Sequence, residues 1–244
     1  MDKEICSPLN AYFNWSGGKD SALALYKILQ QQNYKINYLL TSVNAAHDRI
    51  SMHGVRRELL LAQSASIGIP LTTIELPEQP GMGEYENAMM QKVNELKNAG
   101  CTHAIFGDIF LEDLKLYREQ KLATAGIECI FPLWMIDTTQ LVHEFIDLGF
   151  KAIIVCVNEQ YLDKSFCGKI IDKDFLNDLP STVDPCGENG EFHSFVFDGP
   201  VFKTPITFTK GEIVRRTYAA PKNADDSCGV ANADYGFYFC DLVA

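Results

Sequence analysis

The residues with the most specific chemistry form a short loop near the start of the chain. The loop combines two hydroxyls, two adjacent glycines and a charged pair, in the order Ser16, Gly17, Gly18, Lys19, Asp20 and Ser21. It falls between an expected strand and an expected helix, where backbone N–H groups and the positive end of the helix dipole face the same side. Glycines let the backbone approach a ligand closely, and the lysine places a compact charge on phosphate oxygens. The loop therefore predicts a polyphosphate-binding site.

Two other phosphate-binding patterns do not fit this sequence. It has no Gly-x4-Gly-Lys-Ser/Thr loop, and no Gly-x-Gly-x-x-Gly fingerprint follows an expected strand. Transfer of the γ-phosphate, as in a kinase, therefore loses support. The alternative is that the two glycines form a turn that starts a helix and binds nothing; the strand-loop-helix context favours the anion site.

A second polar group occupies residues 187–193, where two carboxylates, an amide and an imidazole fall within seven positions. Carboxylates and imidazole handle protons, and carboxylates also bind magnesium or orient an amine nucleophile. The two carboxylates need not have the same role. The alternative is a solvated turn with incidental charges. The side chains are those of Glu188, Asn189, Glu191 and His193, with Gly187 and Gly190 permitting a tight turn.

Asp108 follows Gly107 at the carboxyl end of an expected strand. Open α/β sheets bind ligands at that edge, so we expect Asp108 beside the ribose, the α-phosphate or magnesium, although a helix cap is the alternative. Arg118 offers a forked contact for a carboxylate or phosphate, whereas a surface arginine is the commoner role. Asp113 and Tyr117 likewise have either a functional role in the site or a purely structural one.

The sequence around these residues alternates short apolar runs with longer amphipathic ones, which is typical of βαβ units around a mainly parallel sheet. Beyond residue 157 the pattern favours antiparallel strands. We therefore expect an α/β fold, with a Rossmann-like nucleotide domain over residues 1–135 and a smaller α+β substrate-binding domain over residues 136–244. The expected strands are residues 12–15, 38–43, 71–76, 102–107, 151–157, 192–197, 206–208, 212–218 and 236–242. Residues 127–134, which follow residues 118–125, are expected to be extended, and the expected helices are residues 21–32, 53–68, 85–99 and 138–148.

Composition excludes several classes of protein. The chain has 244 residues, of which 47% are hydrophobic and 22% charged, as in ordinary globular proteins. Its formal net charge of −11 argues against a broad nucleic-acid-binding surface, because Lys and Arg supply most non-specific affinity. No run approaches the roughly 20 apolar residues of a membrane span, and no signal peptide is evident. We expect a soluble, cytoplasmic protein without nucleic-acid or membrane partners.

The eight cysteines are dispersed and form no Cys-x-x-Cys pair, so a structural zinc site or a redox pair has little support. Several lie inside apolar runs, which favours buried thiols. They are Cys6, Cys101, Cys129, Cys156, Cys167, Cys186, Cys228 and Cys240.

The ordered series of motifs resembles the diphthine–ammonia ligase family and its relatives, within the adenine nucleotide α-hydrolase superfamily of N-type ATP pyrophosphatases. The similarity runs over about residues 11–205, and the tail from Lys222 matches nothing that helps. The motifs are residues 16–21, Met52-His53-Gly54, Gly107-Asp108 ahead of Tyr117-Arg118, Pro132-Leu133-Trp134, and residues 186–193.

The resemblance implies a HUP-type α/β fold in which the loop holds the departing pyrophosphate. His53, expected at the start of the second helix, becomes a candidate nucleotide contact, and Trp134 is expected to pack at the domain junction. The residues assigned to catalysis are Lys19, Asp108, Glu188 and Glu191. Those assigned to the nucleotide are Ser16, Gly17, Gly18, Lys19, Asp20, Ser21, Ser42, His53 and Gly107. Those assigned to the substrate are Tyr117, Arg118, Asn189, Gly190 and His193.

The resemblance also implies a reaction. ATP, with Mg²⁺ on its phosphates, activates a carboxylate as an adenylate, and ammonia then attacks to give an amide, AMP and pyrophosphate. Positioning and charge stabilisation suffice for such chemistry, so no covalent protein nucleophile is required. In the named ligase the acceptor is diphthine, a modified histidine on translation elongation factor 2, but the family includes members in organisms that make no diphthamide. The acceptor, the ammonia source, the metal ligands and the oligomeric state, including a homo-oligomer, stay open.

Two other functions use the same loop. A tRNA-modifying or sulfur-transferring enzyme favours a basic flank and catalytic cysteines, against which the acidity and the dispersed cysteines weigh. A non-catalytic adenine-nucleotide sensor is disfavoured because both the complete loop and the acidic cluster at residues 187–193 are present.

Overall fold

A parallel sheet centred on strand β1 carries the phosphate loop at its carboxyl edge in this computed structural model, which describes residues 7–50, 53–78, 80–218 and 235–244. The parallel strands run in the order β4-β2-β1-β5-β6, and the short β3 pairs antiparallel with β2 beyond the end of β1. The strand order reverses at β1, between β2 and β5. This is the position at which open α/β sheets bind ligands.

The elements follow one another along the chain as an alternating α/β half and a mainly antiparallel half. In the first half they are β1 (Leu9–Asn14), α1 (Lys19–Gln31), β2 (Tyr34–Asn44), β3 (Arg49–Ile50), α2 (Arg57–Ile67), β4 (Leu71–Leu76), α3 (Met82–Asn98), β5 (His103–Ile105), α4 (Glu112–Ala123) and β6 (Glu128–Ile130). In the second half they are α5 (Thr138–Asp147), β7 (Lys151–Asn158), the 3-10 helix η1 (Lys164–Phe166), α6 (Lys173–Asp178), β8 (Phe192–Asp198), β9 (Thr209–Tyr218) and β10 (Tyr235–Val243).

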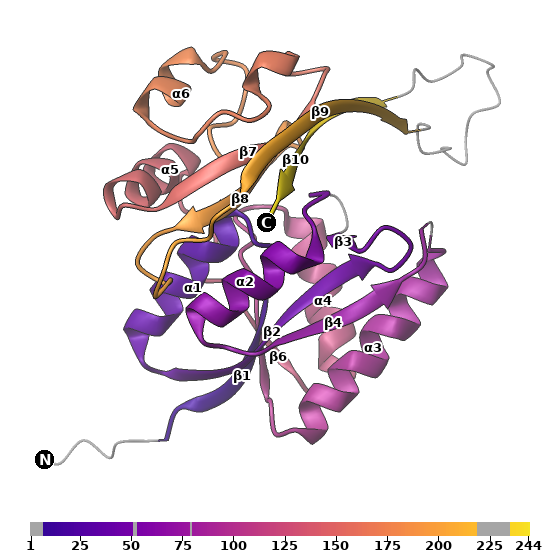
Figure 1. The fold of residues 1–244 in the computed structure, drawn as a ribbon. Helices are drawn as coiled ribbons and strands as arrows, with labels where there is room; N and C mark the ends of the chain where they lie inside the picture. The colour runs from indigo at the N-terminus through magenta and orange to yellow at the C-terminus, as the bar shows by residue number, and fades with distance from the viewer. Residues whose placement is uncertain (1–6, 51–52, 79, 219–234) are drawn as a thin grey trace, which may run out of the picture.

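Helices cover both faces of the parallel sheet. α3 packs on the outer strand β4 and α4 on the opposite outer strand β6, whereas α1 and α2 lie on the other face (Figure 1). The buried apolar residues of α1 are Ala22, Leu23, Ala24, Leu25 and Ile28, so the helix is covered on more than one side, as its position between the two sheets requires. Helix α2 ends at Gly68 in the left-handed conformation typical of a helix C-terminus.

The second sheet is antiparallel, in the order β8-β7-β10-β9, and lies above the first in Figure 1 with α1 and α2 between them. One hydrophobic core joins the two halves, since Leu25 of α1 and Leu59 of α2 belong to the same buried cluster as Phe195 of β8. Lys27 of α1 also forms an ion pair with Glu144 of α5 at 2.6 Å. The expected combination of a parallel α/β sheet and a smaller α+β region is confirmed.

Three expectations about elements were wrong. Residues 206–208 form no strand, because only Ile206 makes a backbone bond to β8, by donating to Phe197 O at 2.7 Å. The second helix begins at Arg57 rather than at His53, since Gly54 adopts a φ of 70°, which no helix accommodates. The short β3 and α6 were not expected, because neither is long enough to show periodicity. Met52 of the Met-His-Gly motif and residues 222–234 of the tail lie outside the described residues.

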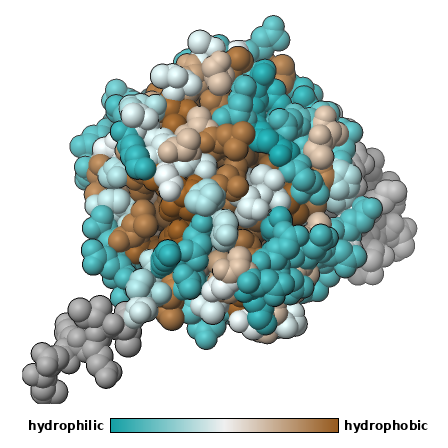
Figure 2. Space-filling view, turned by 60° about the horizontal axis from the view of Figure 1, so that its bottom comes forward, coloured by the Kyte–Doolittle hydropathy of each residue, from teal (hydrophilic) through white to brown (hydrophobic). Residues whose placement is uncertain are grey.

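Figure 2 shows the molecule turned so that the bottom of Figure 1 comes forward. Hydrophobic residues gather in the middle of this face, between hydrophilic ones. Large apolar side chains that reach solvent include Leu29, Leu61 and Leu116, all on helices. Within the described residues, none of the helices has both the length and the apolar character of a membrane span.

One carboxylate on the C-terminal strand β10 binds two arginines, one on β3 and one at the start of α2. Asp241 of β10 accepts from Arg49 Nη1 at 2.8 Å and from Arg56 Nη2 at 2.6 Å. The hydrogen bond from Arg56, followed by that from Arg49, lowers the pKa of Asp241 to about 2. The charged form therefore stabilises the fold.

Replacing Asp241 by Asn removes this charge, and we expect it to lower the free energy of unfolding at pH 7 by about 1 kcal/mol. Because the folded-state pKa is depressed, the contribution is complete above the ordinary aspartate pKa of about 4 and disappears as the pH falls through about 2. Urea unfolding of the native and variant chains between pH 7 and pH 2 measures it. Asp174→Asn on the exposed face of α6 is the control, and an equal loss at every pH contradicts the interpretation.

Candidate active site

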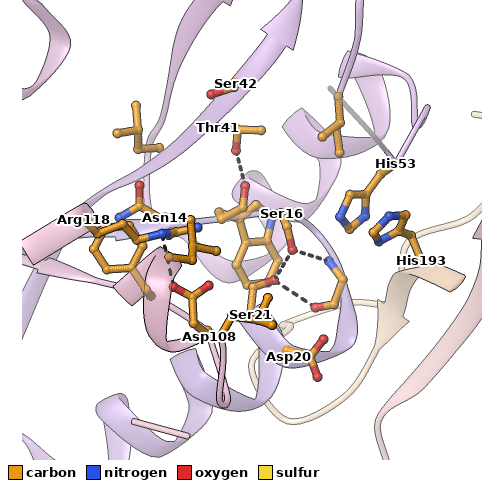
Figure 3. Close-up of a pocket in the computed structure, with 18 of the residues that line it drawn as sticks. Asn14, Ser16, Asp20, Ser21, Thr41, Ser42, His53, Asp108, Arg118 and His193 are labelled. Atoms are coloured by element: carbon orange, nitrogen blue, oxygen red, sulfur yellow. Dashed lines mark hydrogen bonds and ion pairs between the residues drawn. The ribbon is translucent and has the colours of Figure 1, made fainter. Parts of the chain in front are cut away.

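The phosphate loop is closed by its own hydroxyls at the start of α1 (Figure 3). Ser16 Oγ accepts from Gly18 N at 3.2 Å and lies 3.0 Å from Ser21 Oγ, which donates to Gly18 O at 2.9 Å. No side chain caps the helix at Gly18. Because the N–H of Lys19 donates to Ser194 Oγ, the first-turn N–H groups that remain for an anion are those of Asp20 and Ser21.

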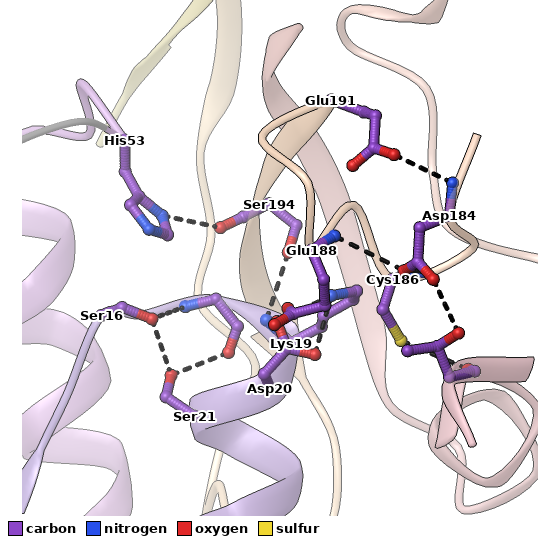
Figure 4. Close-up of polar contacts among 12 residues, drawn as sticks. Ser16, Lys19, Asp20, Ser21, His53, Asp184, Cys186, Glu188, Glu191 and Ser194 are labelled. Carbon is purple, nitrogen blue, oxygen red and sulfur yellow. Dashed lines mark hydrogen bonds and ion pairs between the residues drawn. The ribbon is translucent and has the colours of Figure 1, made fainter. Parts of the chain in front are cut away.

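Lys19 lies inside the site and is only 3% exposed. Its ammonium group donates to both carboxylate oxygens of Asp20 at 2.7 Å, and its backbone N–H donates to Ser194 Oγ at 3.1 Å (Figure 4). Burial lowers the pKa of the Lys19 ammonium, but Asp20, with Cys186 and Glu188, raises it above the ordinary value. Lys19 is therefore a fixed positive charge beside the first turn of α1.

The fully buried side-chain amide of Gln63 holds the phosphate loop in position. Gln63 of α2 donates from Nε2 to Gly17 O at 3.1 Å and to Val196 O at 2.6 Å, and its Oε1 accepts from the Trp15 indole at 2.9 Å. Gly17 itself has a φ of 76°, and a Cβ there would lie 2.8 Å from Gln63 Oε1. The close approach of the loop to the amide therefore requires a glycine at position 17. The carbonyl oxygen of Gly17 also accepts from Val196 N at 2.9 Å.

The loop opens into a cavity of about 620 Å³, which lies within the range of roughly 300–1,000 Å³ found for ligand sites. Both halves of the chain contribute to its wall. The expected site residues that line it are Ser16, Gly18, Lys19, Asp20, Ser21, Ser42, His53, Gly107, Asp108, Tyr117, Arg118, Glu188, Gly190 and His193. Three expected site residues do not line it: Gly17, Asn189 and Glu191.

Asp108 and Arg118 form an ion pair at one side of the cavity, with Arg118 Nε 3.2 Å from Asp108 Oδ2. The guanidinium lies 4.3 Å from the centre of the Phe106 ring. Asp108 Oδ2 is buried and has no hydrogen-bond partner among the described residues. Burial raises the pKa of Asp108, and Arg118 opposes the change. Asp108 Oδ2 thus has an ion-pair partner but no hydrogen bond from the described part of the chain, and a cation or a ligand hydroxyl in the cavity would supply a further contact.

The two glutamates of residues 187–193 have different surroundings. Glu191 is 1% exposed, and its carboxylate accepts from Asp184 N at 3.0 Å and from Asn189 N at 2.8 Å (Figure 4). Glu188 instead lines the cavity, where burial, followed by Asp20, raises its pKa to about 8. Glu191 thus holds the turn together, whereas Glu188 faces the ligand space.

Two histidines stack beside the loop. The rings of His53 and His193 are 4.6 Å apart at an angle of 27°, and both line the cavity (Figure 3). Burial, followed by His193, lowers the pKa of His53 to about 3, and burial with Lys19 lowers that of His193 to about 4. His53 Nδ1 lies 3.3 Å from Ser194 O, which places a proton on Nδ1 and leaves Nε2 to accept. Both rings are therefore neutral near pH 7.

Sequence reasoning missed Gln63 and Ser194. Gln63 lies among buried residues of α2 that include the apolar Leu59, Leu60 and Ile67 as well as Ser64 and Ser66, and a long polar side chain between apolar residues at helical spacing is a usable signal. Ser194 gives no such signal within its strand. Trp134 does not line the cavity and packs against Phe131 at 5.7 Å, in the turn before α5.

Two family models match the chain. The diphthamide synthase N-terminal domain matches residues 10–128, and the diphthamide synthase C-terminal domain matches residues 137–220.

Three similar curated proteins are described as diphthine–ammonia ligase. The Danio rerio protein is 24% identical over 222 residues, which cover 82% of this chain and 86% of the relative. The Schizosaccharomyces pombe protein is 30% identical over 96 residues, which cover 38% of this chain and 16% of the relative. The Bos taurus protein is 34% identical over 87 residues, which cover 34% of this chain and 33% of the relative.

A phosphate loop at the switch point of a parallel sheet defines a nucleotide-binding α/β protein. Within that class, the chain belongs to the diphthine–ammonia ligase family, with its two diphthamide synthase domains in the expected order. This confirms the family predicted from the motifs, and the curated relatives support an enzyme of the ATP-dependent ligase type.

Gln63→Met keeps the approximate shape of the side chain but leaves Val196 O and the Trp15 indole without their buried partner, while Gly17 O keeps the bond from Val196 N. Since an unsatisfied buried group costs about 1–3 kcal/mol, we expect a loss of stability on the order of 3 kcal/mol. We also expect ATP affinity to fall several-fold, because the loop loses its support. Thermal unfolding and ATP titration measure both effects. Gln91→Met on the exposed side of α3 is the control, and full retention of ATP affinity contradicts the role of Gln63.

Glu188→Gln removes a carboxyl group whose folded-state pKa is raised. The native chain loses stability as the pH rises from the ordinary glutamate pKa of about 4 towards about 8, because ionisation of Glu188 is disfavoured in the fold. We therefore expect the variant to melt at a higher temperature than the native chain at pH 8.5 and at the same temperature at pH 4. A melting point that is lower at pH 8.5 shows instead that the Glu188 charge stabilises the fold.

Proposed function

We propose that this protein is an ATP-dependent ligase that adenylates a carboxylate, releases pyrophosphate and transfers ammonia to form an amide and AMP. The single observation that carries the proposal is the buried Lys19 beside the uncapped start of α1, in one cavity with Glu188. Lys19 and the first-turn N–H groups bind the pyrophosphate that departs. Gly18, Ser16 and Ser21 shape this cradle.

The residues around the cradle suit the α-phosphate and the incoming amine. We assign Asp108 to the α-phosphate or its metal ion, Ser42, His53 and Gly107 to the nucleoside side, and Tyr117 with Arg118 to the acceptor carboxylate. Glu188 and His193 face the same space, where ammonia attacks through its lone pair, and the ionised form of Glu188 or the neutral imidazole of His193 accepts the proton that the bound amine then loses. Glu191 and Asn189 are assigned to the turn that positions Glu188, because the Glu191 carboxylate is already occupied by that turn.

Mg²⁺ fits the site as a partner of the phosphates. Among the described residues there is no group of three or more His, Cys, Asp or Glu side chains that holds a metal by itself. Magnesium is commonly bound by one or two carboxylates together with substrate phosphates and water. Asp108, whose buried Oδ2 has no hydrogen bond among the described residues, and Asp20 are the carboxylates that would hold it beside the loop. When bound, the ion neutralises the phosphate charge.

None of the six cysteines in the described part of the chain is an activated thiol suited to an alternative, covalent route. Cys186 lines the cavity, but its thiol donates to Thr138 O at 3.3 Å, and burial raises its pKa well above the ordinary value. A protonated buried thiol is a poor nucleophile. This favours direct attack of ammonia over sulfur transfer to RNA, and the net charge of −11 also disfavours a nucleic-acid partner.

The acceptor is a carboxylate on a protein or a small molecule. The curated relatives are described as acting on diphthine, and diphthine is the first acceptor to test. We propose free ammonia as the amine source, and the cytoplasm as the compartment, because the six described cysteines are unpaired. A homo-oligomer remains a prediction.

The test follows the fate of α-³²P-ATP with Mg²⁺, ammonium and a cell extract as the acceptor pool. We expect AMP that depends on the extract, and Lys19→Ala should lower its rate by about 10²–10³-fold, because a charge that meets the leaving group is removed. Lys27→Ala, on the same helix but paired with Glu144, is the control. Formation of ADP, or ATP binding without turnover, overturns the proposal in favour of a phosphotransferase or a sensor.

A further inference from the structure

The cavity has a second, apolar end that the nucleotide does not explain. α3 packs on β4 and α4 on β6, and the order β4-β2-β1-β5-β6 leaves three central strands between the two helices. Side chains from both helices and from β1 and β2 line this end of the cavity, which we call the α3–α4 chamber. It is lined by Tyr12 and Leu40 from the sheet, Met89 and Val93 from α3, and Leu114 and Leu122 from α4.

One polar group lies among these apolar side chains. Tyr12 is 0% exposed, and its hydroxyl has no hydrogen-bond partner among the described residues. A buried hydroxyl without a hydrogen bond destabilises the fold, so a bound partner is the expected reason for its presence. Water is a poor candidate, because it needs two to four polar neighbours. Burial raises the pKa of Tyr12, so the hydroxyl keeps its proton and donates.

Charged side chains surround the entrance to the chamber, and their contacts join α3 to α4. Tyr117 of α4 donates to Glu86 of α3 at 3.1 Å, and Lys121 lies 2.9 Å from the same carboxylate, which joins the two helices across the gap. Arg118 lines the cavity, uses Nε for Asp108 and rests on Phe106, so the donors of its two terminal amino groups are left for a ligand. A carboxylate held there has the chamber on one side and the phosphate loop on the other.

This arrangement suits the acceptor better than adenine. The adenine ring carries several hydrogen-bonding nitrogens, and the chamber offers one hydroxyl, so most of them would lose their partners on binding. Asn14 and Thr41 also line the cavity, but each already donates one hydrogen bond, to Ile105 O and Trp15 O respectively, so they offer a base few further polar groups. Ser42 and His53 offer polar groups to the base elsewhere in the cavity.

We propose that the α3–α4 chamber binds the side group of the acceptor: an apolar, flat or branched group with one hydrogen-bond acceptor at its far end, attached to the carboxylate that is activated. The proposal rests on the ligase function for the identity of the ligand, but the chamber binds it without turnover. Tyr12 is a specificity-determining residue in this scheme, and Arg118 holds the carboxylate.

The probes are 3-phenylpropanoate and 3-(4-pyridyl)propanoate, which differ in the one hydrogen-bond acceptor. Titration calorimetry of the full chain measures their affinities, and a parallel titration measures ATP. We expect the native chain to bind the pyridyl compound about three- to tenfold more tightly, since a net hydrogen bond contributes about 0.5–1.5 kcal/mol. Tyr12→Phe removes this preference while leaving the shape of the chamber and ATP affinity unchanged.

Met89→Trp fills the chamber, and we expect at least tenfold weaker binding of both probes with ATP affinity retained. Leu116→Trp, on the exposed side of α4, is the matched control and leaves all three affinities unchanged. Loss of ATP binding in Met89→Trp while the control keeps it shows that the base occupies the chamber and overturns the proposal. So does a native chain that binds neither probe, or a Tyr12→Phe variant that keeps the preference.

The two proposals fail separately. Probe binding requires no catalysis, so the absence of AMP formation contradicts the ligase function and leaves the chamber intact. Normal AMP formation that depends on Lys19, without binding of either probe, contradicts the chamber alone.

Discussion

The buried amide of Gln63 is the constraint on which the site depends. It contacts Trp15 and Gly17 before α1 and Val196 on β8, so it joins three segments that are distant in the sequence. An amide with no solvent to replace these partners must keep all of them, because each lost bond leaves a buried group unsatisfied. The phosphate loop is thus positioned by the C-terminal half as much as by the strand that precedes it.

The same close packing sets the charges of the cavity. Lys19 stays charged because Asp20 compensates for its burial, whereas Glu188 holds a proton and His53 and His193 lose theirs. Groups with displaced pKa values are characteristic of sites that bind charge and move protons. An anionic ligand would meet the positive charge of Lys19 at one side of the cavity and groups that can exchange protons at the other. The fold accepts an unfavourable carboxyl environment at Glu188 to keep this arrangement.

The cavity therefore divides into a polar end at the phosphate loop and an apolar end between α3 and α4. The division follows from the topology, since helices that cover the two outer strands leave space over the central ones. Asp108 and Arg118 lie where the ends meet, next to Phe106. A reaction that joins a nucleotide to a second molecule needs such a meeting point.

The sequence by itself determined the phosphate loop, the family and most elements, and β4 matches its expected bounds residue for residue. These features are local: an apolar alternation or a glycine-rich turn acts through neighbours along the chain. The sequence could not distinguish the roles of Glu188 and Glu191, which share one motif. Asp184 N donates to the Glu191 carboxylate within the neighbouring turn, and this contact decides that Glu188 is the carboxylate that faces the cavity. Sequence reasoning also misplaced the start of α2 at His53. Only the tertiary structure brought Ser194 to Lys19 across 175 positions, because such contacts depend on how the two sheets pack and not on local pattern.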